Sequence, residues 1–358
     1  MRSCIMLRIV PGTVNKIQQA NVPPRQDTSP SWQQCLADGF RTPEALLNFL
    51  SIDANDPTIA SRIINNNPFP VRVTRRYAAR MVPGDLNDPL LRQVLPLHEE
   101  ALDISGFTTD PLDEAKQNPV PGLLHKYHGR VLLTLTGTCA INCRFCFRRH
   151  FDYSSNNPGR AGWQTAMDYI AKDTSIQEVI LSGGEPLMAS DKTFSELFTT
   201  LSALPHIKRI RFHTRLPLLL PERFTENLYN LMRAVLISKQ IILVLHTNHA
   251  NEIDDSVAEV ITRLKQLGVE TLNQSVLLAG INDTIEPLVQ LSEALYTMGV
   301  LPYYLHQLDK VAGTAHFEVS EKKGRALIAS MQAVLPGYMV PKYVREEAFA
   351  QSKTEILT

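Results

Sequence analysis

The stretch Cys139-Ala-Ile-Asn-Cys143-Arg-Phe-Cys146 places three of the chain's five cysteines within eight residues, and both fold and chemistry can be argued from it. Nothing in the chain suggests a secretory route, so we expect free thiolates here rather than disulfides. Three thiolates can hold three irons of a [4Fe-4S] cluster and leave the fourth iron open to another ligand. A closed zinc site would need a fourth ligand, for which His150 is the nearest candidate, and this alternative stays open.

The residues before the cysteine loop form a short apolar run, Arg130-Val-Leu-Leu-Thr-Leu-Thr136, which predicts a buried strand of a parallel sheet or barrel. A second such run, Glu178-Val-Ile-Leu-Ser182, ends directly in Gly183-Gly184-Glu185-Pro186. Barrel enzymes carry their active sites on the loops that follow the carboxyl ends of the strands. The cysteine loop and the glycine turn are therefore both expected at such a site.

Several segments together resemble the radical S-adenosylmethionine enzymes and, among them, the lysine 2,3-aminomutases. These segments are the cysteine loop continued to His150, the Gly-Gly-Glu-Pro turn, Asn273-Gln-Ser-Val-Leu-Leu278, Val120-Pro-Gly-Leu-Leu-His-Lys-Tyr127 and Pro302-Tyr-Tyr-Leu-His306. The last two are most similar to the short bacterial form of the family, which serves the β-lysylation of elongation factor P. The resemblance runs from about Gln34 to Lys353.

Composition agrees with a globular enzyme. The chain has 358 residues, 44% hydrophobic and 20% charged, which allows one barrel domain and a smaller appendage. Its 36 basic and 36 acidic side chains cancel, so no overall charge favours nucleic acid or an anionic membrane surface. No run reaches the roughly eighteen apolar residues of a spanning helix, and we expect a cytoplasmic protein.

We expect an α/β fold in three parts. Residues 1–105 form a polar arm, 15–30, and a helical appendage; 106–312 form an incomplete parallel (βα)6-type radical SAM barrel; 313–358 form a C-terminal segment. The predicted barrel strands are 130–136, 178–182, 209–214, 241–246, 271–276 and 302–307, and the predicted barrel helices are 163–172, 192–204, 222–231, 255–267 and 284–298. In the appendage, helices are predicted near 31–36, 42–50, 60–64, 74–81 and 88–94.

The resemblance implies a [4Fe-4S] cluster on Cys139, Cys143 and Cys146, S-adenosylmethionine and pyridoxal phosphate. S-adenosylmethionine yields a hydrogen-abstracting radical, and pyridoxal phosphate carries the amino group as an imine while this group migrates. Such chemistry needs a lysine that binds the pyridoxal aldehyde, and Lys353 matches the family's lysine. The family's glycine-rich stretch is here Glu346-Glu-Ala-Phe-Ala-Gln-Ser-Lys353, which has no glycine. Considered without the family, Lys353 would be an ordinary solvated charge.

The resemblance also implies the groups that hold the phosphate and the substrate. Lys126 and Arg130 fall where the family places two phosphate-binding arginines. Arg148 matches the arginine that binds the substrate carboxylate, and Asp309 and Glu346 match the two acids that bind its side-chain ammonium. Patterning alone leaves open that these are solvated charges or surface ion pairs.

For S-adenosylmethionine the resemblance points to Ser182, Gly183, Gly184 and Glu185, and to Gln274 and Ser275 at the end of a later strand. The glycines would let the backbone approach the ligand, and Glu185 would bind its ammonium, although a Gly-Gly pair is more often only a tight turn. His246 and His249 are not expected to form a second metal site. Cys4 and Cys35 are expected to be incidental thiols.

The function that the resemblance implies is conversion of L-α-lysine into β-lysine, expected as the R isomer, for the modification of elongation factor P by a separate lysine ligase. An external electron donor is implied, and the oligomeric state is left open. Two alternatives stay open. The scaffold also serves glutamate 2,3-aminomutase, for which Asp309 and Glu346 would be repulsive, and a non-catalytic iron–sulfur or zinc protein that binds elongation factor P is possible.

Overall fold

The structure is a computed structural model that describes residues 30–64, 67–153 and 159–357. Within it, the described residues from Ser31 onward form one compact unit. The predicted arm up to residue 29 and Cys4 lie outside the described residues. No helix of the described part is both long enough and apolar enough to cross a bilayer.

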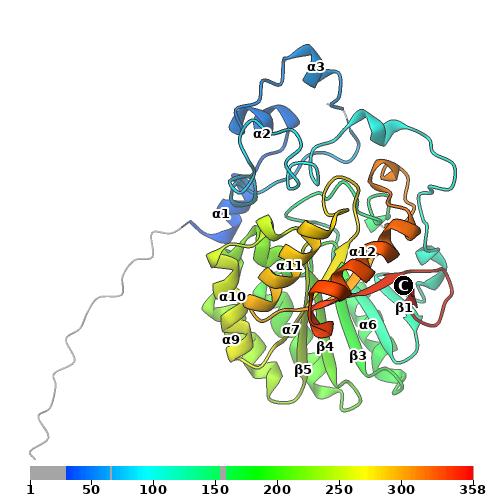
Figure 1. Ribbon diagram of the computed structural model, residues 1–358. Helices are drawn as coiled ribbons and strands as arrows, with labels where there is room; N and C mark the ends of the chain where they lie inside the picture. Colours follow the sequence, from blue (N-terminus) through cyan, green and yellow to red (C-terminus); the bar gives the residue numbers. More distant parts are fainter. Residues whose placement is uncertain (1–29, 65–66, 154–158, 358) are drawn as a thin grey trace, which may run out of the picture. The chain divides into compact units, whose positions relative to one another are not determined.

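One sheet of nine strands, ordered as in the chain, organises the described part of the molecule (Figure 1). Strands β2 to β8 run parallel, and β1 and β9 are antiparallel at the two edges. The bounds are β1 (Leu123–Tyr127), β2 (Arg130–Thr136), β3 (Glu178–Gly183), β4 (Arg209–Thr214), β5 (Gln240–His246), β6 (Glu270–Val276), β7 (Leu301–His306), β8 (Lys342–Arg345) and β9 (Thr354–Glu355). No backbone ladder joins β1 to β9 in this sheet, so the barrel is incomplete, as expected.

The six predicted strands are all present, each within one residue of its predicted bounds. The clearest of them was β3, buried along five of its six residues, because a continuous apolar run is typical of a parallel strand covered on both faces. The strands β1, β8 and β9 were not predicted. They are short and carry charged or polar side chains, as in Lys342-Tyr-Val-Arg345, so no apolar run marks them.

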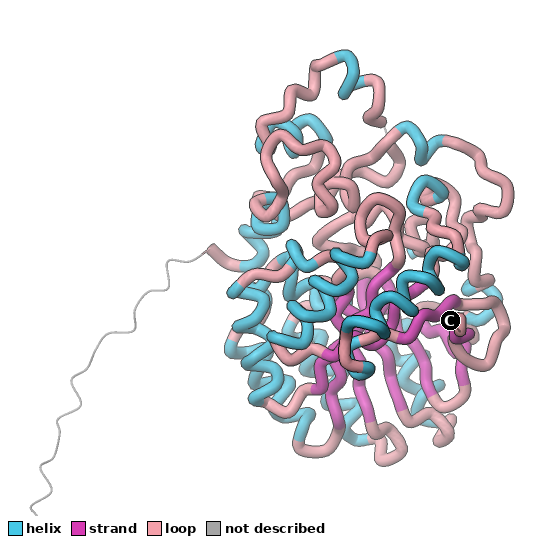
Figure 2. Tube along the Cα trace, in the orientation of Figure 1, coloured by secondary structure: helices cyan, strands magenta, loops and turns pink. Residues whose placement is uncertain are grey.

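Helices surround the strands (Figure 2). Those of the barrel are α6 (Gly159–Lys172), α7 (Asp191–Ala203), α8 (Leu216–Leu219), α9 (Glu226–Leu236), α10 (Asp255–Gln266), α11 (Ile285–Thr297) and α12 (Glu321–Val334). Helix α9 begins four residues after the start predicted at 222, because the Thr225 hydroxyl caps it by accepting from Leu228 N. The residues before this cap, Pro221–Arg223, form a 3-10 turn that begins at the proline. Helix α12 was not predicted.

The N-terminal region has short helices joined by loops: α1 (Trp32–Ala37), α2 (Pro43–Phe49), α3 (Pro57–Ala60) and α4 (Arg75–Ala78). The predicted helix at 88–94 is wrong, because this segment forms turns in which Asp88 accepts from Leu90 N and Leu91 N. The helix predicted at 60–64 is largely wrong, since α3 ends at Ala60. Apolar side chains of this region, such as Leu46 and Tyr77, belong to the same core cluster as the barrel strands.

Candidate active site

A cavity of about 330 Å³ lies within the curled sheet, lined by side chains of β1 to β7 and of the loops around them. It brings together residues that are more than two hundred positions apart in the chain. The predicted site residues on its wall are Lys126, Arg130, Cys139, Cys143, Cys146, Arg148, Ser182, Gly183, Gly184, Glu185, Gln274, Asp309, Glu346 and Lys353. Ser275 does not line it.

Ser275 points away from the cavity because side chains alternate along a strand. Its hydroxyl donates to Thr247 O at 2.7 Å and accepts from Asn273 Nδ2 at 2.9 Å, and the residue is buried. Its neighbour Gln274 faces the cavity instead. The Ser275 side chain is therefore not available for the nucleotide contact expected of it.

The cysteine loop follows β2 and is held by backbone and side-chain groups of the N-terminal region. Arg72 Nη1 donates to Cys139 O at 2.8 Å, and Asn142 Nδ2 donates to Pro70 O at 2.9 Å. Further along the loop, Arg144 N donates to Gln93 O at 2.8 Å. These contacts make the predicted appendage part of the cysteine site, which no local pattern in residues 31–105 indicated.

The glycine turn after β3 packs directly against the start of the cysteine loop. Gly184 N donates to Thr136 O and Glu185 N to Thr138 O, both at 2.9 Å. A Cβ at Gly184 would lie 2.7 Å from Thr138 O, and Gly183 has a φ of 101°, which favours glycine. The glycines thus allow the two loops to approach each other, a reason different from the ligand approach that we predicted.

Lys353 lies at the open seam of the barrel, where the two edges of the sheet come close. Glu346, just beyond β8, accepts a hydrogen bond from Lys353 Nζ and another, at 3.1 Å, from Lys126 Nζ on β1. The three side chains are largely buried. Although burial opposes it, the two ammonium groups hold the pKa of Glu346 well below its usual range. Side chains, not a backbone ladder, therefore bridge the seam.

Arg148 forms a bidentate ion pair with Glu114. Its Nε donates to Glu114 Oε2 at 2.8 Å, and its Nη2 donates to Glu114 Oε1 at 2.6 Å. Both side chains are buried and line the cavity. This bidentate pair fixes the orientation of Arg148 and leaves Nη1, 3.4 Å from Ser182 Oγ, directed at the remaining wall. Glu114 was not predicted, since a single acid in a polar segment carries no sequence signal.

Asp309 lies on the cavity wall beyond β7. Burial, reinforced by the negative charge of Glu346, raises its pKa to about 7. The ammonium groups of Lys126 and Lys353 bond to Glu346 and not to Asp309. A cation brought by a ligand would therefore stabilise the ionised form of Asp309.

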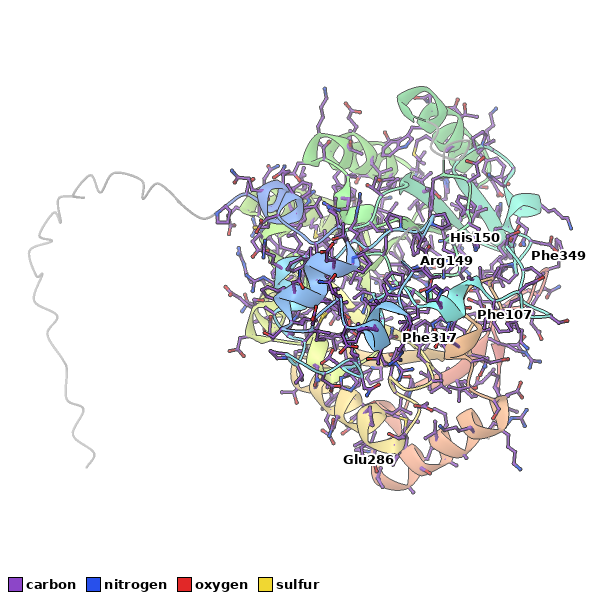
Figure 3. All side chains as sticks on the ribbon, turned by 90° about the horizontal axis from the view of Figure 1, so that it is seen from above. Phe107, Arg149, His150, Glu286, Phe317 and Phe349 are labelled. Carbon is purple, nitrogen blue, oxygen red and sulfur yellow. The ribbon has the colours of Figure 1, made fainter. Side chains whose placement is uncertain are left out.

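The loop from Glu346 to Lys353 does without the family's glycines by placing one residue in the left-handed region. Phe349 has a φ of 61° and is 61% exposed. It lies at the periphery in Figure 3, as does Glu286, whereas Arg149, His150 and Phe317 lie nearer the middle of that view. The turn that glycine would normally supply is therefore made by a phenylalanine that points outward.

Comparisons with known proteins agree with this geometry. The Radical SAM superfamily profile matches residues 133–292. A protein named L-lysine 2,3-aminomutase from Escherichia coli (strain K12) is 47% identical over 94% of this chain and 96% of its own length. The chain belongs to the L-lysine 2,3-aminomutase family.

More distant relatives carry the same name. The Haemophilus influenzae protein is 42% identical over 90% of this chain and 95% of its own length. The Clostridium subterminale protein is 32% identical over 91% of this chain and 77% of its own length. Among solved structures, a radical SAM methyltransferase from Sphaerobacter thermophilus aligns with 63% of this chain and 69% of its own at 13% identity. Its TM-score of 0.43 is too low to add to the argument. Membership of the aminomutase family implies a [4Fe-4S] cluster, S-adenosylmethionine and pyridoxal phosphate.

The three cavity cysteines fit the cluster of the aminomutase family. Burial raises the pKa of Cys139 well above its usual value and that of Cys146 to about 11, and each thiolate is further opposed by its neighbours. Burial and mutual repulsion therefore oppose the thiolate forms of Cys139 and Cys146, and the positive charge of bound iron would compensate them. His150 does not line the cavity, and its Nε2 lies 3.1 Å from Ala312 O, so it is not placed as a fourth zinc ligand.

Glu185 fits the ammonium of S-adenosylmethionine. Its carboxylate accepts from Thr214 Oγ1 at 2.6 Å, Arg215 N at 2.9 Å and Leu187 N at 3.1 Å, which fixes it at the cavity wall. Burial raises its pKa to about 7 despite these hydrogen bonds. A bound ammonium would compensate the buried negative charge.

Pyridoxal phosphate fits the wall beside β1 and β2. Arg130 Nε and the Tyr127 hydroxyl are buried and have no hydrogen-bond partner in the described part of the chain. The Arg130 guanidinium stacks on the Tyr127 ring at 4.8 Å, and both residues line the cavity with Lys126. A phosphate would supply acceptors to these orphaned donors.

Proposed function

We propose that this protein is an L-lysine 2,3-aminomutase that moves the α-amino group of L-lysine to the β-carbon, with (R)-β-lysine as the expected product. The observation that carries the proposal is the shared cavity, in which Lys353 from the end of the chain joins the three cysteines that follow β2. The names of the close relatives support the same reaction.

The two halves of the cavity wall have separate tasks. Cys139, Cys143 and Cys146 would hold the cluster, and Glu185 with Gln274 would hold S-adenosylmethionine. Lys353 would bind the pyridoxal group, with Lys126 and Arg130 at its phosphate. When bound, these cofactors supply hydrogen-atom abstraction from an unactivated carbon and a carrier for the migrating nitrogen.

Substrate orientation falls to Arg148 at one end and to two acids at the other. Arg148, held by Glu114, would offer Nη1, which makes only a long contact of 3.4 Å with Ser182 Oγ, to the substrate carboxylate. Asp309 and Glu346 would receive the side-chain ammonium of lysine. Both acids would repel the side-chain carboxylate of glutamate, which disfavours that substrate.

Glu346 has a second task at Lys353. Its carboxylate accepts from Lys353 Nζ, so it would hold this side chain in place and stabilise its ammonium form until the substrate arrives. When a substrate ammonium arrives, Glu346 would exchange its contact with Lys353 for the new cation.

The test is anaerobic reconstitution with iron, sulfide, pyridoxal phosphate, S-adenosylmethionine, a reductant and L-lysine, followed by chromatography of the amino acids. We expect β-lysine from the native protein, a loss of at least a thousandfold for Lys353→Ala, and near-native turnover for Lys342→Ala. Lys342 is a matched control, because its side chain is 60% exposed and pairs with Glu355 on the outer edge of the sheet. Borohydride reduction followed by mass spectrometry should place a pyridoxyl group on Lys353. Cleavage of S-adenosylmethionine without β-lysine would refute the proposed substrate.

We further propose that the β-lysine serves a separate ligase that attaches it to elongation factor P, and that an external donor reduces the cluster. A cytoplasmic location goes with this proposal. The support is the similarity to the short bacterial form in Val120–Tyr127 and Pro302–His306. Addition of purified ligase and elongation factor P to the same reaction should raise the mass of the factor by one lysyl residue, and an unchanged mass would separate this step from the mutase reaction.

A further inference from the structure

A buried arginine outside the cysteine motif contacts one of its sulfur atoms. Arg215, in the turn after β4, donates from Nη1 to Cys143 Sγ at 2.8 Å. It lies 72 residues beyond Cys143 in the chain, and the Arg-Leu-Pro segment that contains it gave no reason to assign it a role. Neither Cys139 nor Cys146 receives a side-chain hydrogen bond from the described residues, so the three sulfurs are not equivalent.

The guanidinium of Arg215 is held rigidly by four further hydrogen bonds. Glu252 Oε2 accepts from Nε at 3.2 Å and from Nη2 at 2.7 Å, while Gln93 Oε1 and the Tyr77 hydroxyl accept from Nη2 at 2.6 and 2.9 Å. The ring of Tyr77 lies 5.3 Å from the guanidinium carbon, and the ring of Phe145 in the cysteine loop lies 5.7 Å from it. Every one of these side chains is buried.

The counter-ion of Arg215 is fixed equally well. Glu252 also accepts from Asn248 N at 2.9 Å, His249 N at 3.1 Å and Gln93 Nε2 at 3.3 Å, and its side chain is fully buried. The positive charge beside Cys143 and the negative charge behind it therefore keep constant positions.

We propose that Arg215 is a positioning residue that raises the reduction potential of the cluster, and that Glu252 limits this rise. The inference rests on the proposed cluster at Cys139, Cys143 and Cys146. Reduction adds negative charge to an iron–sulfur cluster, and hydrogen bonds to its sulfurs together with nearby positive charge stabilise that state. A rigid, dry arginine contributes both to one sulfur, and a carboxylate behind it opposes the effect.

The test is a redox titration of the reconstituted cluster, followed by electron paramagnetic resonance without S-adenosylmethionine or lysine. At the native midpoint potential we expect Arg215→Gln to lower the ratio of reduced to oxidised cluster at least tenfold, which equals 59 mV for one electron. Arg215→Lys should recover part of this loss. Glu252→Gln should change the ratio in the opposite direction, because it removes the opposing charge and keeps the donor.

Arg211→Gln is the matched control. Arg211 lines the same cavity and pairs with Glu178 at 2.7 Å, but it contacts no cluster cysteine. Its loss should leave the midpoint unchanged. If the Arg215→Gln protein does not retain iron, the test rests on Glu252→Gln. A positive shift of its midpoint potential supports the proposal, and an unchanged midpoint potential overturns it.

Two other results would overturn the proposal. One is a shift of the same sign for Arg215→Gln and Glu252→Gln. The other is an unmoved midpoint with weakened binding of S-adenosylmethionine, which would assign the guanidinium to that ligand. The titration needs neither lysine nor pyridoxal phosphate, so failure to form β-lysine would refute the proposed function and leave this result standing.

Discussion

Glu346 and Asp309 show how two acids of the same site come to differ. Glu346 has two lysine ammonium groups in contact and stays ionised, with a pKa well below the usual range. Asp309 lies near the same charges, but burial and the Glu346 carboxylate dominate and raise its pKa to about 7. The first acid can receive a ligand's cation only by giving up a contact with one of the protein's own lysines, whereas the second can receive a cation directly.

The raised pKa of Asp309 has a consequence for stability. In the cofactor-free protein the folded state binds more protons than the unfolded state between the ordinary pKa of 3.8 and about 7, so stability decreases as pH rises through this window. We expect Asp309→Asn to stabilise the cofactor-free protein at pH 8 by on the order of 1–2 kcal/mol, after discounting for partial exposure, and to have a smaller effect at pH 5.

Urea unfolding at the two pH values measures this effect, with Asp283→Asn as the control. Asp283 pairs with Lys323. Although burial acts to raise the pKa of Asp283, the contact with Lys323 holds this pKa below the usual value. Asp283→Asn should therefore not stabilise the protein at pH 8. The same Asp309→Asn variant should raise the KM for lysine. Destabilisation by Asp309→Asn at pH 8 would contradict the assignment of a raised pKa.

At the scale of elements, the loop between β8 and β9 determines where Lys353 lies. Strand β9 begins directly after the lysine and pairs with β8, and Ile356 N donates to Tyr343 O at 2.8 Å. The loop turns at Phe349 in the left-handed region, so the family's glycines are not needed for the turn, at the cost of local strain.

Glycine at position 349 should relieve that strain. We expect Phe349→Gly to be more stable than Phe349→Ala by about 1 kcal/mol, because both lose the same exposed ring and only alanine keeps the unfavourable Cβ. Urea unfolding of the two variants gives this difference. Borohydride trapping at Lys353 should be unchanged in both, and a more stable alanine variant would show that the turn at Phe349 is not left-handed.

At the scale of the whole molecule, the N-terminal region contacts the cysteine loop through a residue that lies far from it in the sequence. Glu100 pairs with Arg144 through two hydrogen bonds and with Arg149 Nη2 at 2.6 Å, and all three side chains are almost completely buried. Both arginines belong to the cysteine loop or follow it immediately. One carboxylate therefore joins the N-terminal region to the loop that would carry the cluster.

Removal of the Glu100 charge should weaken both the fold and the cluster. We expect Glu100→Gln to cost about 3–5 kcal/mol of unfolding free energy, because two buried guanidinium groups lose their counter-ion. Iron retained after reconstitution should fall in parallel. Glu99→Gln is the matched control at the neighbouring, exposed position and should change neither quantity. Full iron content in a destabilised Glu100→Gln protein would show that the clamp serves the fold alone.

Sequence patterns predicted the parts of this molecule whose signal is local. Six of the seven parallel strands were found, the clearest of them, such as β3, because they are apolar runs. The cysteine loop was found because its ligands lie within eight residues. Strands β1, β8 and β9 were missed because short polar strands form only when a sheet edge is already present to pair with. The predicted helix at 88–94 was wrong because Asp88 bonds the backbone nitrogens of a turn.

By itself, the sequence determined the order of the barrel strands, the cysteine triplet and, through family resemblance, a set of site residues of which all but Ser275 line the cavity. Only the tertiary structure decided which distant groups meet: Glu114 with Arg148, Lys126 with Glu346 across the open seam, and Arg215 with Cys143. It also turned Ser275 away from the cavity. The physical reason is that apolar periodicity and ligand spacing act over a few residues, whereas these contacts depend on how the whole sheet curls.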